Sequence, residues 1–164
     1  MTQTDELLKN NEAYSSSFRK NWRIESRPRR KVAIIACMDA RLDIYKILGL
    51  MEGDAHIIRN AGGVVTDDTI RSLLVSQRLL GTEEIILIHH TGCGMLSING
   101  EEIKKAIQAE IGIEPPFAIE TFEDLEQDVR QSITRIRTSP FVIKKEGTRG
   151  FVYDMETGKL REVI

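Results

Sequence analysis

The sequence predicts an α/β domain in which helices flank a mainly parallel central β-sheet, preceded by an N-terminal helical arm. Strand-like and helix-like segments alternate from Lys31 onward, and such alternation favours a parallel sheet. The first strand candidate, residues 31–37, is a nearly continuous apolar run rich in Val and Ile, as in strands buried on both faces. Residues 1–30 are polar, so we expect a helix and arm there and one α/β domain over residues 31–164.

The N-terminal segment predicts a polar helix over residues 4–20. Its main apolar side chains are Leu7, Leu8 and Phe18. Three apolar side chains cannot bury much surface against their own domain, so we expect the helix to lie against another surface. Residues 21–30 contain four arginines and Trp22. They form either a solvated linker or an arm that wraps a partner subunit, with Trp22 as its anchor.

The remaining elements are predicted from apolar periodicity and from residues that begin or end helices. Thr66 can cap a helix over residues 67–80, and Gly81 can end it. Further helices are expected at residues 42–50, 101–111 and 122–137. The last of them would carry Phe122, Leu125, Val129, Ile133 and Ile136 on one face. Further strands are expected at residues 55–59 and 84–89, with a terminal hairpin at residues 150–154 and 159–164.

The overall composition excludes several classes of protein. The formal net charge of −2 gives no electrostatic argument for nucleic acid or an anionic membrane as a partner. The first residues lack the pattern of a secretion signal, and the apolar runs fall far short of a membrane span. Two cysteines in 164 residues do not make a disulfide scaffold. We therefore expect a cytoplasmic protein with reduced thiols.

Both cysteines and one histidine fall where a ligand of such a sheet would bind. Ligands of parallel sheets bind beyond the carboxyl ends of the strands. Cys37 ends the first predicted strand, and His90 and Cys93 follow the third. Two thiolates and an imidazole suit Zn²⁺, and three protein ligands leave a fourth position open, as in catalytic zinc sites. The alternative is ordinary buried thiols and a core histidine.

Asp39 and Arg41 follow Cys37 at intervals of two residues. In an extended stretch the three side chains project to the same side, so the carboxylate and the guanidinium can pair and keep Asp39 ionised. Asp39 would then accept a hydrogen bond from zinc-bound water and orient it. If Arg41 released it, Asp39 could instead take the fourth zinc position and close the site. The alternative is an ordinary loop ion pair.

Two other features are less specific. In a regular strand His89 points away from His90, so we expect it to be a packing or supporting residue rather than a ligand. His56 is given no role. The run Asn60-Ala61-Gly62-Gly63 either marks a turn or allows the backbone to approach a small ligand closely.

Three motifs together resemble the β-class carbonic anhydrases, in particular their short prokaryotic and archaeal branch. They are Cys37-Met38-Asp39-Ala40-Arg41, Arg59-Asn60-Ala61-Gly62-Gly63 and His90-Thr91-Gly92-Cys93-Gly94, in the order and at separations compatible with the family. The resemblance implies one Zn²⁺ per chain, held by Cys37, His90 and Cys93. It makes Asp39 and Arg41 the orienting pair. It also implies a homodimer or dimer-based oligomer with the N-terminal helix packed on a neighbouring subunit.

The activity that this resemblance implies is the reversible hydration of CO₂ to bicarbonate and a proton by zinc-bound hydroxide, a carbon–oxygen lyase reaction. Two thiolates cancel the charge of Zn²⁺, so hydroxide should form less readily than at the three-histidine site of the well-known carbonic anhydrases, unless Asp39 assists. The rate should therefore rise with pH on the alkaline side of neutrality. Backbone N–H groups at Gly62, Gly63 or Gly94 are candidates for binding the anionic product. Val64 and Val65, with the apolar residues of helix 67–80, are candidates for the CO₂ pocket.

Other functions remain open at this point. The same scaffold could hydrolyse COS or CS₂, which are linear like CO₂. It could also be a non-catalytic module that binds zinc or bicarbonate, although an intact Asp39–Arg41 pair argues against mere binding. A nucleotide-binding domain would need Gly-x-Gly-x-x-Gly after a strand, and the sequence has none.

Overall fold

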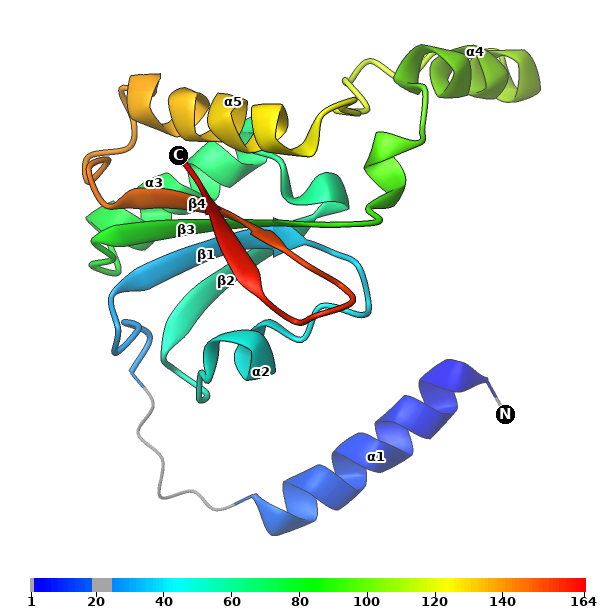
Figure 1. The fold of residues 1–164 in the computed structure, drawn as a ribbon. Coiled ribbons are helices and arrows are strands. Elements are labelled where there is room, and N and C mark those ends of the chain that lie inside the picture. Colours follow the sequence, from blue (N-terminus) through cyan, green and yellow to red (C-terminus); the bar gives the residue numbers. More distant parts are fainter. Residues whose placement is uncertain (1, 19–24) are drawn as a thin grey trace.

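A five-stranded sheet forms the centre of the computed structural model, which describes residues 2–18 and 25–164 (Figure 1). The strand order is β2-β1-β3-β4-β5. The strands are β1 (Val32–Cys37), β2 (Ala55–Asn60), β3 (Glu84–His90), β4 (Thr148–Tyr153) and β5 (Leu160–Val163). β1 to β4 are parallel, and β5 pairs with β4 in the antiparallel direction. The predicted mainly parallel sheet and terminal hairpin are therefore confirmed.

Helices lie on both faces of the sheet. The helices of the described residues are α1 (Gln3–Ser17), α2 (Ile44–Leu48), α3 (Asp67–Arg78), α4 (Gly100–Ile111) and α5 (Leu125–Thr138), of which α2, α3 and α5 pack on the sheet. Two short 3₁₀ segments, η1 (Ala61–Gly63) and η2 (Gly94–Leu96), follow β2 and β3. α3 and α5 cover one face of the sheet, and α2 lies on the other (Figure 1). No helix among the described residues combines the length and the apolar character of a membrane span.

The sheet is buried on both faces, as the apolar run of β1 predicts. One core cluster lies under α3 and α5 and includes Ala33, Ile35, Leu73, Ile85 and Ile136. The second lies on the α2 side and includes Ile34, Ala36, Ile44, Ile88 and both cysteines. Alternate residues of β1 serve the two clusters, because successive side chains of a strand point to opposite faces. This two-sided burial makes the ends of β1 and β3 rigid supports for side chains.

Capping residues place the boundaries of α2 and α5 differently from the periodicity. Asp43 accepts a hydrogen bond from the backbone N–H of Lys46, and Gly49 adopts a left-handed conformation, so α2 occupies only part of the expected 42–50 segment. Asp124 caps α5, which therefore begins at Leu125 rather than at residue 122. The prediction that Phe122 lies on this helix is wrong. Phe122 precedes it and is buried in the α2-side cluster.

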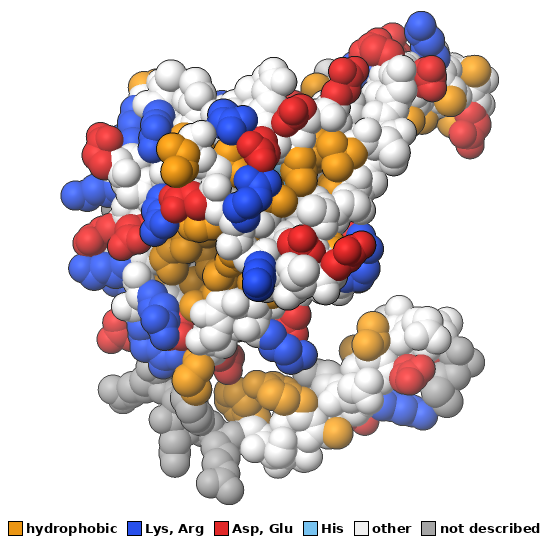
Figure 2. All heavy atoms as spheres, viewed as in Figure 1, with side chains coloured by type: hydrophobic (Ala, Val, Ile, Leu, Met, Phe, Trp, Pro, Cys, Tyr) orange, Lys and Arg blue, Asp and Glu red, His pale blue; other side chains and the backbone are white. Residues whose placement is uncertain are grey.

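The helix α1 projects away from the rest of the chain (Figure 1). A capping box between Thr2 and Asp5 begins it, yet it buries none of its residues. Its apolar side chains, some visible as hydrophobic spheres in Figure 2, are each more than half exposed: Leu7, Leu8, Tyr14 and, just beyond it, Phe18. The expectation that this helix does not bury against its own domain is confirmed. The predicted anchor Trp22 lies outside the described residues.

The end of the predicted arm is attached to the α/β domain by an ion-pair cluster. Arg29 and Arg30 both pair with the carboxylate of Asp54, at 3.0 and 3.3 Å. Asp54 is buried and also accepts a hydrogen bond from the backbone N–H of Met51. These contacts hold the arm next to the start of β2.

Candidate metal centre

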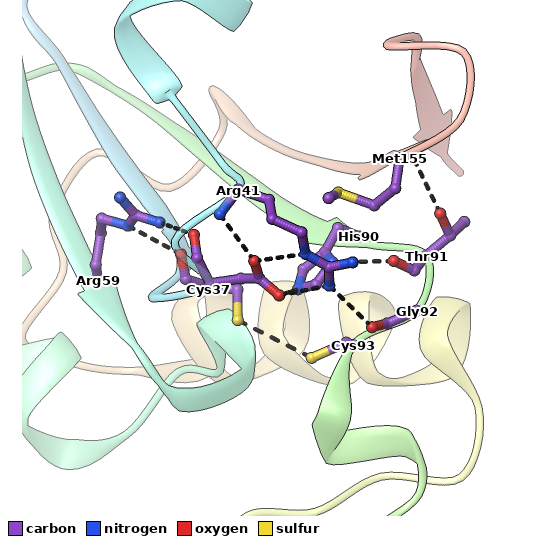
Figure 3. A network of polar contacts seen from close by, with 9 residues as sticks. Cys37, Arg41, Arg59, His90, Thr91, Gly92, Cys93 and Met155 are labelled. Carbon is purple, nitrogen blue, oxygen red and sulfur yellow. Dashed lines mark hydrogen bonds and ion pairs between the residues drawn. The ribbon is translucent and has the colours of Figure 1, made fainter.

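Cys37, His90 and Cys93 converge at the carboxyl ends of β1 and β3 (Figure 3). Their donor atoms all lie within 4.8 Å of one another, all three residues are buried, and the two sulfurs are 3.9 Å apart. Cys37 and His90 are the last residues of the two neighbouring strands, so the parallel pairing of β1 with β3 brings both to the same edge of the sheet. Gly92, with a φ of +65°, turns the chain so that Cys93 returns to the same place.

His90 presents a nitrogen that suits a metal ion. Its Nδ1–H donates to the carbonyl of Thr91 at 3.0 Å, so Nε2 carries a free lone pair. Nε2 is buried and has no hydrogen-bond partner among the residues that the structure describes. Burial also lowers the pKa of His90, which favours the neutral imidazole that metals bind. A buried acceptor without a partner is costly unless a cation satisfies it.

The two cysteine sulfurs, like His90 Nε2, are suited to binding a cation. Burial, and to a smaller extent the adjacent Cys37, raises the pKa of the Cys93 thiol to about 11. Without a cation the Cys93 thiol therefore keeps its proton at neutral pH, and binding of a divalent ion would displace that proton. Two buried sulfurs and one imidazole nitrogen form a donor set that zinc prefers. The residues present thus fit a zinc ion.

Asp39 and Arg41 form a two-pronged ion pair beside these donors. Arg41 donates from Nε to Oδ1 at 2.9 Å and from Nη2 to Oδ2 at 2.7 Å, and its backbone N–H donates to Oδ1. These bonds hold the pKa of Asp39 well below its usual range. The predicted pair is confirmed, but not along an extended stretch. The strand ends at Cys37, and a turn closed by the backbone bond from Leu42 to Asp39 brings the side chains together.

The carboxylate of Asp39 lies next to the three donors rather than among them. Its Oδ2 is 3.7 Å from His90 Nε2. The group of donors within 4.8 Å of one another contains Cys37, His90 and Cys93 and does not include Asp39. Arg41 also donates to the carbonyl of Gly92 at 3.3 Å, so the loops after β1 and β3 are joined at this point.

The glycines after β2 have packing roles. A Cβ at Gly63 would lie 2.7 Å from the backbone nitrogen of Cys37, so only glycine allows η1 to pack against the end of β1. A Cβ at Gly62 would lie 3.1 Å from Phe122 and 3.2 Å from Met95. Nothing lies within 4 Å of the corresponding position at Gly94. Binding of substrate by Gly62, Gly63 and Gly94 stays a prediction.

The two valines proposed for the CO₂ pocket lie in different core clusters. Val64 belongs to the cluster that contains both cysteines. Val65 packs with Leu73 and Ile70 of α3 in the cluster on the other face of the sheet. Val64 is thus close to the metal centre, whereas Val65 and the apolar stripe of α3 are separated from it by the sheet.

The other two histidines are engaged elsewhere. His89 is fully buried, its Nε2 lies 2.6 Å from Asp128 of α5, and its ring contacts Phe122. His56 Nδ1 lies 2.8 Å from the hydroxyl of Ser76. The expectation that His89 supports the structure and binds no metal agrees with this placement. Its partner Asp128 was not foreseen, because the two residues are 39 positions apart.

Arg59 contacts the site in a way that sequence reasoning missed. Its Nε donates to the carbonyl of Cys37 at 2.9 Å, and its Nη2 donates to the carbonyl of Asp39 at 2.7 Å (Figure 3). The sequence contained no signal for these bonds beyond the position of Arg59 at the start of a motif. They connect β2 to the loop that carries both a candidate ligand and the orienting carboxylate.

A parallel α/β sheet that gathers two cysteines and a histidine at adjacent strand ends defines a zinc enzyme. A family model described as carbonic anhydrase matches residues 32–160. Beta-carbonic anhydrase 1 of Mycobacterium tuberculosis is 56% identical over 163 residues, which cover 99% of each chain. The chain belongs to the β-class carbonic anhydrases, a family of zinc enzymes.

Two further comparisons place it within that family. A crystal structure of carbonic anhydrase from Streptococcus mutans superposes with a TM-score of 0.90 at 38% identity, covering 100% of this chain and 99% of that one. The carbon disulfide hydrolase of an Acidianus species is 35% identical over 157 residues, covering 81% of this chain and 77% of that protein. The same scaffold therefore occurs in proteins named for two different substrates.

Proposed function

We propose that this chain catalyses the reversible hydration of CO₂ to bicarbonate and a proton, with one zinc ion held by Cys37, His90 and Cys93. The observation that carries the proposal is the convergence of these three donors around a buried His90 nitrogen that has no hydrogen-bond partner in the described part of the chain. It occurs in a chain that is 56% identical, along its whole length, to a β-carbonic anhydrase. Together they favour a carbonic anhydrase over a non-catalytic zinc-binding module.

The three ligands would occupy three of the four tetrahedral positions and leave one for solvent. When bound, zinc supplies a Lewis acid that makes water a usable nucleophile near neutral pH. The ionised Asp39 can only accept hydrogen bonds. It would accept one from the nucleophile and so turn the lone pair of that oxygen towards the substrate.

Arg41 would keep Asp39 in this role. Both carboxylate oxygens of Asp39 are bonded to Arg41, which supports the open arrangement over one in which Asp39 takes the fourth zinc position. CO₂ is uncharged, so an apolar wall such as Val64 suits it, and backbone N–H groups near Gly62, Gly63 and Gly94 could meet the anionic product. His89 and His56 are engaged elsewhere, so we expect buffer to accept the proton.

Hydrolysis of CS₂ or COS is the second candidate, because proteins named carbon disulfide hydrolase are 33% to 35% identical to this chain. The higher identity to a carbonic anhydrase, over a larger share of both chains, favours CO₂. Release of H₂S from CS₂ or COS, measured beside CO₂ hydration, distinguishes the two activities.

We further propose that residues 1–30 form a helix and arm, and that residues 31–164 form the catalytic domain of a homodimer or a dimer-based oligomer. The helix α1 buries none of its residues and leaves its apolar side chains more than half exposed, which supports this assembly. The two free cysteines at a zinc site suit a reducing compartment, so we propose the cytoplasm.

Stopped-flow CO₂ hydration together with metal analysis tests the proposed activity. We expect about one zinc ion per chain and a rate far above the buffer blank. Asp39→Ala should keep its zinc and lose about a hundredfold in rate, because the nucleophile is no longer oriented. Asp68→Ala removes an exposed aspartate that pairs with Arg71 and makes no contact with the three ligands, and it should change neither quantity.

The outcomes separate the parts of this proposal. A wild-type protein that binds zinc and leaves CO₂ hydration at the blank would overturn the enzymatic function. Full activity of Asp39→Ala would remove the role assigned to Asp39 while leaving the zinc site in place.

A further inference from the structure

Arg59 is the side chain that ties the backbone of the Cys37–Asp39 segment to the neighbouring strand β2. Its guanidinium bridges two carbonyls that lie two residues apart, those of Cys37 and Asp39. One belongs to the residue whose sulfur is a candidate ligand, and the other to the residue whose carboxylate would orient the nucleophile. Among the described residues Arg59 forms no ion pair, so the two carbonyls are the partners of its guanidinium.

The segment that Arg59 holds has few other supports. Met38, Ala40 and Arg41 are exposed. The backbone N–H of Met38 donates to the carbonyl of Asn60 at 2.8 Å, which fixes the segment just after Cys37. Beyond that point the carbonyl of Asp39 accepts from Leu42, within the same turn, and from Arg59. Arg59 thus links the backbone of Asp39 to strand β2, whereas the bond from Arg41 to the carbonyl of Gly92 links the side chain of Asp39 to the loop after β3.

We propose that Arg59 is a positioning residue, which keeps the Cys37 sulfur and the Asp39 carboxylate in one fixed relation. This inference rests on the proposed function. Arg41 sets the rotation of the Asp39 carboxylate, and Arg59 sets the place of its backbone. Small displacements of a catalytic group can lower a rate about a hundredfold, so a fixed backbone matters here.

The geometry calls for a guanidinium rather than any cation. Nε and Nη2 lie on one edge of a rigid plane and donate in parallel directions, so one side chain meets both carbonyls at once. A lysine has a single nitrogen on a flexible stem and cannot donate to both carbonyls in this fixed, parallel geometry. We therefore expect Arg59→Lys to lie between the wild type and Arg59→Ala.

The first experiment compares Arg59→Ala with Arg137→Ala in the zinc-loaded, full-length protein. Arg137 also donates to a backbone carbonyl, that of Thr148 at 3.3 Å, far from the metal centre in sequence, so it is a matched control. We expect Arg59→Ala to lower kcat for CO₂ hydration roughly 10- to 100-fold, the usual range for groups that hold a ligand or catalytic residue in place. Arg137→Ala should retain wild-type kcat.

The second experiment asks whether Arg59 acts through Asp39. In a double-mutant cycle, Arg59→Ala should lower kcat strongly in the wild-type background and less than about twofold in the Asp39→Ala background. A merely structural role would lower kcat by the same factor in both backgrounds. Added guanidinium ion, at concentrations that leave the fold intact, should partly restore the rate of Arg59→Ala and leave that of Asp39→Ala unchanged.

The third readout does not depend on activity. Competition with a chelator should show that Arg59→Ala weakens zinc binding by about tenfold, because the backbone of Cys37 is less constrained. The absorption of the cobalt-substituted protein should change in Arg59→Ala and stay unchanged in Arg137→Ala. If Arg59→Ala does not fold, the same measurements are made on Arg59→Lys.

The inference is overturned if an active wild type shows equal kcat and metal affinity in Arg59→Ala and Arg137→Ala. It is also overturned if the factor by which kcat falls in the double variant equals the product of the factors for Arg59→Ala and Asp39→Ala. Failure of the proposed function gives a different result, since the wild type itself would then show no CO₂ hydration.

Discussion

The strand ends around Cys37 and the helix α1 differ in how far their side chains are buried and bonded within the same chain. At the strand ends all three candidate ligands are buried, and Asp39, Arg41 and Arg59 are bonded to groups of the same chain. In α1 the backbone is well capped, yet no residue is buried. The polar groups of the first region find partners within the chain, whereas the second region leaves its apolar side chains in solvent.

This difference shows which properties belong to the single chain and which to its assembly. A helix of 15 residues with little apolar contact is marginal in water by itself, even with a good cap. The metal centre instead rests on strands buried on both faces. Changes at the strand ends should therefore affect metal binding and catalysis, whereas changes in α1 should affect association.

The largest effect is expected from the loss of a ligand. Cys37→Ser should reduce zinc content and CO₂ hydration to background, because the hydroxyl is a much poorer zinc ligand than a thiolate. Met38→Ser, at the exposed neighbouring position, should keep both. Metal analysis and stopped-flow rates on the two variants measure this. Retention of zinc by Cys37→Ser would show that the three donors do not form the metal site.

The next largest effect is expected from Gly63, which tests how tightly the strand ends are packed. Gly63→Ala puts a Cβ 2.7 Å from the backbone of Cys37 and strains a φ of +72°. We expect the free energy of unfolding to fall by roughly 2–4 kcal/mol in urea titrations. Gly49→Ala has a similar φ with open space around it, so it should lose only about 1 kcal/mol. Equal losses in the two variants would contradict the packing role of Gly63.

The pH dependence of the rate tests the charge of the metal centre. Two thiolate ligands cancel the charge of Zn²⁺, so water is acidified less than at a site with three neutral histidines. The rate should therefore increase with pH, by about tenfold between roughly pH 7 and 9, while zinc content stays constant. A rate that is flat from about pH 6 to 9 would contradict this explanation.

The smallest effect on catalysis is expected in α1. Leu7→Lys places a charge among the exposed apolar side chains, so the assembly should dissociate more easily while each chain keeps its zinc. Light scattering over a range of concentrations should show a dissociation constant raised about tenfold or more. Ser16→Lys adds the same charge to the opposite face of the same helix and serves as the control. An unchanged mass distribution in Leu7→Lys would remove α1 from the interface.

Several features of the fold and the site could be predicted because they depend on local patterns. The apolar run of β1 and the cap at Thr66 indicate their elements directly, and both are confirmed. The boundaries of α2 and α5 could not be predicted from periodicity alone. The caps at Asp43 and Asp124 decide where these helices begin, and Gly49 decides where α2 ends.

The site was predictable only in part, for a related reason. Cys37, His90 and Cys93 were identified because each lies at a strand end, and parallel strands bring their ends to one edge of a sheet. The bonds from Arg59 to the carbonyls of Cys37 and Asp39 involve backbone atoms 20 and 22 residues away, and backbone acceptors leave no mark in a sequence. The pairing of His89 with Asp128 was hidden in the same way.

The sequence by itself therefore determined the fold class, the donor set and the presence of an Asp39–Arg41 pair, because residue type and short-range spacing encode them. Only the tertiary structure decided which nitrogen of His90 faces the sulfurs, that Val64 and not Val65 lies on the cysteine side, and that Arg59 holds the Cys37–Asp39 segment. Those properties depend on the register of β1 with its neighbours and on which side chains the packed chain brings within bonding distance.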